Sequence, residues 1–133
     1  MLSAMPEIDF SGDEMPWRVT LCGPPRTPYQ NGKFTLKLTF PSAYPTAPPR
    51  VRFLTPIHHP NVDAKGTICL DLLASSAWRP HFTLPTILLG VQQLLAHPNA
   101  ADALVGSIGR QFLYARAAFD REASECAARF ASG

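Results

Sequence analysis

Residues 33–40, KFTLKLTF, alternate between apolar and polar side chains over eight positions. Because successive side chains of a β-strand point to opposite faces of a sheet, this pattern predicts a strand with one buried and one exposed face. The segment WRVTLC, residues 17–22, alternates in the same way, and a run of turn formers separates the two. A third, shorter alternating run is VRFL at 51–54. We therefore expect three neighbouring strands in an antiparallel meander.

The second half of the chain changes to a helical pattern. In TLPTILLGVQQLLAHPN, residues 83–99, apolar side chains recur at the spacing of one helix face. Thr83 is a candidate cap for this helix and Pro98 a candidate stop. A further apolar stripe runs from about Leu104 to the C-terminus and is predicted to break in two near Tyr114. Helices packed on one face of a sheet make an α+β domain.

Charge is distributed unevenly along the chain. Residues 1–16 contain four acidic residues and no lysine or arginine, and they show neither helical nor strand periodicity. We expect a flexible acidic arm there, followed by one core domain over residues 17–133. The net charge of +2 is too small to indicate a nucleic-acid partner.

The composition also limits the compartment and the chemistry. No apolar run approaches the length of about 18 residues that a membrane span requires, and the N-terminus lacks the features of a signal peptide. The three cysteines, Cys22, Cys69 and Cys126, are too widely spaced for a zinc site or a disulfide framework. We expect an intracellular protein, cytoplasmic or nuclear, that is monomeric and binds no metal and no membrane.

The segment HHPNVDAKGTICLDLL, residues 58–73, contains the candidate functional residues. Cys69 follows Asn61 by eight positions. Most free cysteines are small buried residues without chemistry, so one interpretation of Cys69 is a core residue. The other is a nucleophile at the accessible tip of a loop, because Lys65 and Gly66 form a turn before it. A cysteine–histidine hydrolase is disfavoured, since no residue is evident that would orient a histidine base.

A wider stretch carries a resemblance to a known family. YPTAPPRVRFLTPIHHPNVDAKGTICLDLL, with WRP after it and PNAADALV further on, resembles the ubiquitin-conjugating enzymes. The similarity extends from about Trp17 to the C-terminal ARFA, and RFLTPI and AWRP are most similar to a subgroup that monoubiquitinates in DNA cross-link repair. The resemblance implies a four-stranded antiparallel sheet flanked by helices. Family members usually begin with a basic amphipathic helix, which we expect to be missing here.

The resemblance also implies an activity. Cys69 would accept ubiquitin as a thioester from an activating enzyme and yield it to a lysine, usually with a ligase and without a cofactor. Two alternatives remain open: a catalytically inactive scaffold of the same fold that binds ubiquitin or a ligase, and a carrier for a ubiquitin-like modifier such as SUMO.

Roles for single residues follow from the same resemblance. Asn61 would either donate its amide to the oxyanion formed at the thioester carbon or hold the active-site loop in place. Asp102 would orient the incoming lysine and help to deprotonate it. The remaining motif residues have supporting roles: Asp71 and Leu104 line the groove for the ubiquitin tail, and His59 and Pro60 are structural.

Overall fold

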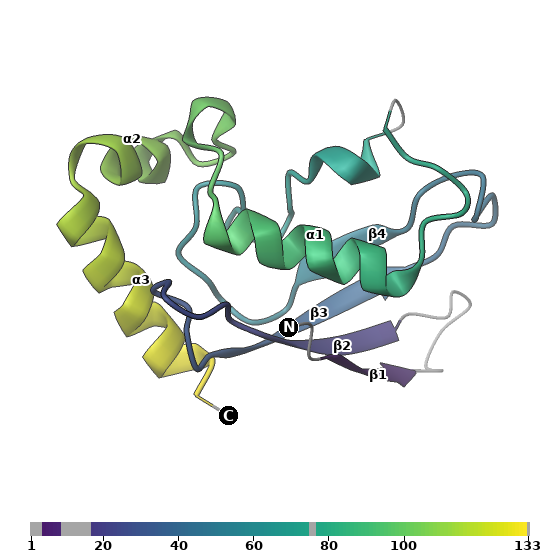
Figure 1. Cartoon of the computed structure of the whole chain (residues 1–133), viewed down its shortest axis with the longest axis horizontal. Helices are drawn as coiled ribbons and strands as arrows, with labels where there is room; N and C mark the ends of the chain where they lie inside the picture. The colour runs from purple at the N-terminus through teal and green to yellow at the C-terminus, as the bar shows by residue number, and fades with distance from the viewer. Residues whose placement is uncertain (1–3, 9–16, 75–76, 133) are drawn as a thin grey trace.

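The computed structural model describes residues 4–8, 17–74 and 77–132 of the chain. Among these residues, the four strands come first in the chain and the helices follow (Figure 1). In chain order they are β1 (Ala4–Ile8), β2 (Trp17–Cys22), β3 (Lys33–Thr39), β4 (Arg50–Phe53), the 3₁₀ helix η1 (Asp71–Leu73), α1 (Leu84–Ala96), the 3₁₀ helix η2 (Ala100–Asp102), α2 (Gly106–Tyr114) and α3 (Arg116–Phe130).

The strands form one antiparallel sheet in the order β1-β2-β3-β4, so the predicted meander of β2, β3 and β4 is confirmed. Val19 and Leu21 of β2 and Phe34, Leu36 and Leu38 of β3 are completely buried, as the alternation predicts, and Trp17 at the start of β2 is partly buried. The alternating residues between them face outward and are partly or fully exposed. The hydrophobic effect on one face therefore sets both the strands and their register.

Strand β1 is a departure from the sequence prediction of an arm without regular structure. Its backbone pairs along β2, with Pro6 opposite Val19. Proline has no N–H to donate, and sheets accept it on an edge strand, the position that β1 occupies. Periodicity did not reveal this strand because backbone pairing with β2 does not require an alternating pattern. The rest of the predicted arm, residues 1–3 and 9–16, lies outside the described residues.

Helix α1 lies across the inner face of the sheet (Figure 1). Its buried residues Ile87, Leu88, Val91 and Leu95 belong to the same hydrophobic core as the inward side chains of the strands. The predicted cap is confirmed, because the Thr83 hydroxyl accepts a hydrogen bond from the Thr86 backbone N–H. The helix ends at Ala96, just before the predicted stop.

Helices α2 and α3 stand together at one end of the sheet (Figure 1). The predicted break is confirmed at Ala115, which has a non-helical backbone between the two helices. Phe119, Ala123 and Ala127 form the buried face of α3. After α3, the Ala131 carbonyl accepts a hydrogen bond from the Lys33 N–H at the start of β3, 2.8 Å away. The end of the described chain is thereby joined to the sheet.

Candidate functional site

A tight loop brings Asn61 and Cys69 together. The Cys69 N–H donates to the Asn61 carbonyl at 3.0 Å, and Val62 and Ile68 form an isolated antiparallel bridge inside this pair. The turn between them is closed by the Asp63 carboxylate, which accepts hydrogen bonds from the N–H groups of Lys65 and Thr67. The eight-residue spacing in the sequence is therefore the length of one closed loop.

Gly66 is the residue that lets this loop lie against the sheet. Its φ of +83° is in the left-handed region, and a Cβ there would come within 2.0 Å of the Phe53 carbonyl oxygen. The Gly66 carbonyl in turn accepts from the Phe53 N–H at 2.9 Å. Glycine is thus required both for the backbone conformation and for the close approach to β4.

The Asn61 side chain holds this loop to the turn that follows α1. It is 1% exposed, and its Oδ1 accepts from the Asn99 N–H at 2.9 Å. Its Nδ2 donates to the Asn99 carbonyl at 2.9 Å and to the Asp102 carbonyl at 3.3 Å. Both amide hydrogens are therefore engaged by backbone carbonyls. This geometry favours the loop-holding role of the two roles considered for Asn61.

His59 and Pro60 attach the same loop to other elements. His59 is completely buried, its Nε2–H donates to the Leu94 carbonyl of α1 at 2.9 Å, and its Nδ1 accepts from the Asn61 N–H at 2.9 Å. The Pro60 carbonyl accepts from the Val105 N–H at 3.0 Å. Burial lowers the pKa of His59 from 6.5 to about 4, so the ring is neutral at pH 7.

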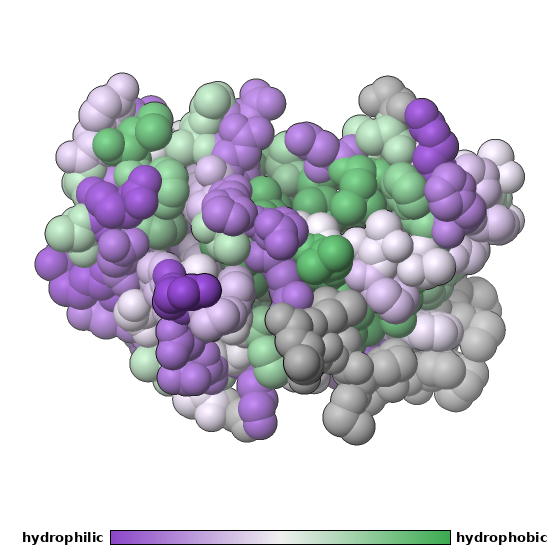
Figure 2. Space-filling view, viewed as in Figure 1, coloured by the Kyte–Doolittle hydropathy of each residue, from purple (hydrophilic) through white to green (hydrophobic). Residues whose placement is uncertain are grey.

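The Cys69 thiol is exposed beside a pocket of about 370 Å³ between η1 and α1. On this face, hydrophobic surface gathers over α1 and the segment above it (Figure 2). No lysine or arginine is among the described residues that line the pocket, so the lining provides no cation to favour the thiolate. Its lining includes Asn61, Cys69, Asp71, Gln93, His97 and Asn99.

The other predicted site residues lie at different distances from this pocket. Asp71 lines it, as the groove role requires. Asp102 is exposed in η2 and joined to Asn61 through its backbone carbonyl, and it is not among the lining residues. Leu104 is 44% exposed and does not line the pocket either. Two roles implied by the resemblance stay predictions: that Leu104 lines the groove for the ubiquitin tail, and that Asp102 orients the incoming lysine and helps to deprotonate it.

The sequence prediction missed three polar residues of the pocket: Gln93, His97 and Asn99. Gln93 and His97 are four residues apart on α1 and its cap, so they share one helix face. The helical pattern of residues 83–99 predicts that this polar face of α1 points away from the core. That exposure was the available signal for a site there. The approach of this face to Cys69 depends on the chain packing and could not be derived from periodicity.

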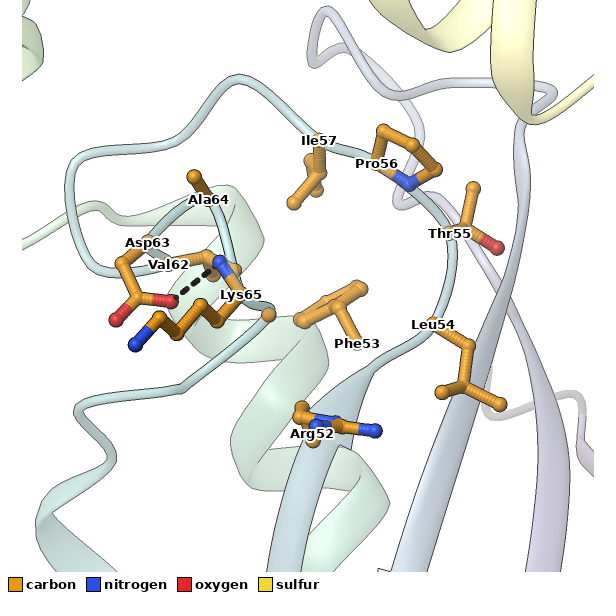
Figure 3. Close-up of a pocket in the computed structure, with 11 residues that line it drawn as sticks. Arg52, Phe53, Leu54, Thr55, Pro56, Ile57, Val62, Asp63, Ala64 and Lys65 are labelled. Atoms are coloured by element: carbon orange, nitrogen blue, oxygen red, sulfur yellow. Dashed lines mark hydrogen bonds between the residues drawn. The ribbon is translucent and has the colours of Figure 1, made fainter.

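A larger pocket, about 590 Å³, lies on another side of the same loop (Figure 3). It is lined by the end of β4, the segment after it and the turn around Asp63 and Lys65. Figure 3 shows the Asp63 carboxylate held by the Lys65 backbone N–H. Cys69 does not line this pocket. Its larger volume therefore does not make it the better candidate for the reaction site.

The other two thiols are in different surroundings. Cys22 and Cys126 are both half-buried, and burial raises the pKa of Cys126. Within the described ranges, no group of three or more histidine, cysteine or acidic side chains could hold a metal ion. None of the helices in the described part of the chain has the length and apolar character needed to cross a membrane.

Comparison with known proteins assigns this arrangement to a family. The family model described as ubiquitin-conjugating enzyme matches residues 3–127, nearly the whole chain. The chain belongs to the ubiquitin-conjugating enzyme family. Two solved structures of the family have the same fold: the E2 domain of a Toxoplasma gondii ubiquitin conjugating enzyme, with a TM-score of 0.89, and a Plasmodium yoelii protein, with a TM-score of 0.90. The Toxoplasma gondii domain is 34% identical to this chain, and the match covers 96% of this chain and 89% of that domain. The Plasmodium yoelii protein is 36% identical, and the match covers 98% of this chain and 84% of that protein.

Curated ubiquitin-conjugating enzymes are more similar in sequence. Ubiquitin-conjugating enzyme E2 T of Mus musculus is 45% identical over 111 residues, which are 81% of this chain and 54% of that protein. The Bos taurus protein of the same name is 43% identical over 118 residues, 86% of this chain and 60% of its own length. This chain therefore spans little more than half the length of these relatives.

Proposed function

We propose that this chain carries ubiquitin as a thioester on Cys69. It receives ubiquitin from an activating enzyme and transfers it to a lysine of a target protein, with a ligase that holds carrier and target together. Membership of the ubiquitin-conjugating enzyme family supports the reaction. The observation that supports the choice of residue is the exposed Cys69 thiol at the end of a loop fixed by Asn61.

The site geometry fits a thioester carrier better than a hydrolase. Exchange between two thioesters requires a thiol that a second protein can reach, and Cys69 is exposed. An unperturbed cysteine is already about 3% thiolate at pH 7, so this exchange needs no dedicated base beside the sulfur. His59, the histidine of the motif, is buried with both ring nitrogens hydrogen-bonded, which makes it unsuitable as a base.

Transfer to a lysine makes a different demand on the site. The acceptor must be held near the thioester and must lose a proton. In the proposed mechanism the Asp102 carboxylate attracts the lysine ammonium, while Asn61 keeps η2 and the Cys69 loop in register through its backbone contacts. Asp71 lies where it can line the path of the ubiquitin tail.

The test uses the three thiols as matched variants. The chain is incubated with ubiquitin-activating enzyme, ATP and ubiquitin, and adducts are separated with and without reducing agent. We expect a reducible adduct for the wild type, Cys22→Ser and Cys126→Ser, and either a stable oxyester or no adduct for Cys69→Ser. A reducible adduct that survives in Cys69→Ser but disappears in Cys22→Ser or Cys126→Ser would refute the assignment.

A further inference from the structure

We propose that His97 is a further catalytic residue of this site. Its imidazole accepts the proton that an incoming lysine loses before it attacks the thioester on Cys69. This inference rests on the proposed thioester function, and it adds His97 to Asp102, to which the family resemblance already gives a part in deprotonating the lysine.

The reaction needs such a group because lysine arrives in its charged form. At pH 7 only about one lysine in 2,500 is uncharged, and only the uncharged amine is a nucleophile. A general base is most effective when its pKa is close to the working pH. Free carboxylates have a pKa of about 4, whereas free imidazole has one of about 6.5, so a histidine is the better acceptor in a neutral solution.

His97 is the histidine that shares a pocket with the thiol. Cys69 and His97 both line the pocket of about 370 Å³ between η1 and α1. His97 is the C-terminal cap of α1, and its backbone N–H donates to the Gln93 carbonyl at 2.8 Å. This bond fixes the backbone while the side chain is exposed to solvent. An exposed ring can take a proton from the pocket and release it to water.

The other polar groups of the pocket are less suited to this task. Asn61 has both amide hydrogens engaged by backbone carbonyls, and neither Gln93 nor Asn99 can accept a proton near neutral pH. Asp71 is the other titratable side chain, besides the thiol, among the described residues that line the pocket. An unperturbed carboxylate is a weaker base than an unperturbed imidazole.

A charged residue of the connection between β2 and β3 shares a second pocket with His97. Arg26 and His97 both line an adjoining pocket of about 420 Å³. Arg26 repels an imidazolium while Asp71 attracts it, so the two charges oppose each other.

The proposed transfer conserves protons and bonds. The lysine nitrogen carries three protons and passes one to His97, which releases it to water. The neutral amine then forms a bond to the thioester carbon, and the bond from that carbon to the Cys69 sulfur breaks with its electron pair on sulfur. The nitrogen loses a second proton, which restores the Cys69 thiol, and keeps the third in the isopeptide bond.

The experiment separates loading from transfer. Wild type, His97→Gln and the control His81→Gln are loaded with ubiquitin, the activating enzyme is stopped, and single-turnover discharge to free lysine is followed from about pH 6.5 to pH 9.5. His81 is a matched control because it is an exposed histidine that does not line the Cys69 pocket. Thermal melting of the three proteins checks that the fold is retained.

We expect equal loading of all three proteins. Discharge of His97→Gln should be about tenfold slower than wild type near pH 6.5, less than the usual general-base effect of about 10²–10⁴ because the group is exposed. The ratio should fall toward one as the pH rises to about 9.5, because a growing share of the lysine is then uncharged without a proton acceptor, and His81→Gln should follow the wild type throughout.

Two outcomes would overturn the inference, and they can be told apart. If the wild type forms no reducible adduct, the proposed function fails and the role of His97 fails with it. If the adduct forms and His97→Gln discharges like the wild type at every pH, or is slower by one constant factor, His97 is not a proton acceptor. In that second case the thioester function is unaffected.

Discussion

Acidification should destabilise the fold through His59. The pKa of this residue is about 4 in the folded chain, because burial disfavours the charged ring, and about 6.5 in the unfolded chain. Between these values the unfolded chain binds a proton that the folded chain does not. The free energy of unfolding therefore falls as the pH is lowered from about 6.5 to about 4.

The size of the effect follows from the interval between the two pKa values. At about 1.4 kcal/mol for each pH unit, the shift of His59 from 6.5 to about 4 corresponds to a loss of about 3 kcal/mol. This is a large part of the 5–15 kcal/mol that stabilises a typical domain. The loss is absent above about pH 6.5 and complete below about pH 4.

Urea unfolding at a series of pH values measures this loss. We expect His59→Gln to be less stable than the wild type at pH 7, because the hydrogen bonds to Leu94 and Asn61 are disturbed, but to lose about 3 kcal/mol less on acidification. His81→Gln, at an exposed position, should keep the dependence of the wild type. In the wild type, the NMR resonances of the folded His59 ring should not titrate above about pH 5. Titration of that ring near pH 6.5, or equal acid sensitivity in His59→Gln and wild type, would refute the reasoning.

Two further predictions concern stability. Gly66→Ala should lower the free energy of unfolding by more than about 1 kcal/mol, since its φ is +83° and its Cβ would meet backbone, whereas Gly106→Ala, at the start of α2, should be neutral or stabilising. Urea unfolding compares the two, and equal effects would contradict the role given to Gly66. Lys37→Thr should raise stability by about 0.5 kcal/mol at low salt, because Lys37 lies between Arg18 and Arg52 on the neighbouring strands. The gain should shrink in high salt and be absent in Lys33→Thr, whose cross-strand partner is Cys22, and a salt-independent gain would contradict the electrostatic explanation.

Elements with a strong period could be predicted from the sequence. The alternation of residues 17–22 and 33–40 predicted β2 and β3 to within one residue, and Thr83 marked the start of α1. Each of these signals reports burial of one face or a local hydrogen bond, which the sequence contains directly. Strand β1 was not predicted, because its pairing with β2 is a contact between backbones and depends little on side-chain identity.

The candidate site was predictable only where local spacing defines it. The closed loop from Asn61 to Cys69 lies within one short segment, so the motif located it. The placement of His97 beside Cys69 requires α1 to pack next to η1, across more than twenty residues of sequence. Gly90 permits that packing, since a Cβ there would come within 2.3 Å of the Leu72 side chain. Such proximity arises from tertiary packing, which periodicity does not report.

The same contacts connect the stability of the fold to the geometry of the site. His59 accepts the Asn61 N–H at Nδ1, and Asn61 holds the Asn99 turn against the Cys69 loop. Protonation of His59 at Nδ1 would remove that acceptor and leave a buried N–H without a partner, at a cost of about 1–3 kcal/mol. Acid should therefore weaken the support of Cys69 together with the fold. The proposed thioester carriage needs an exposed thiol that other proteins can reach, and this chain fixes the Cys69 loop through the buried residues His59 and Asn61.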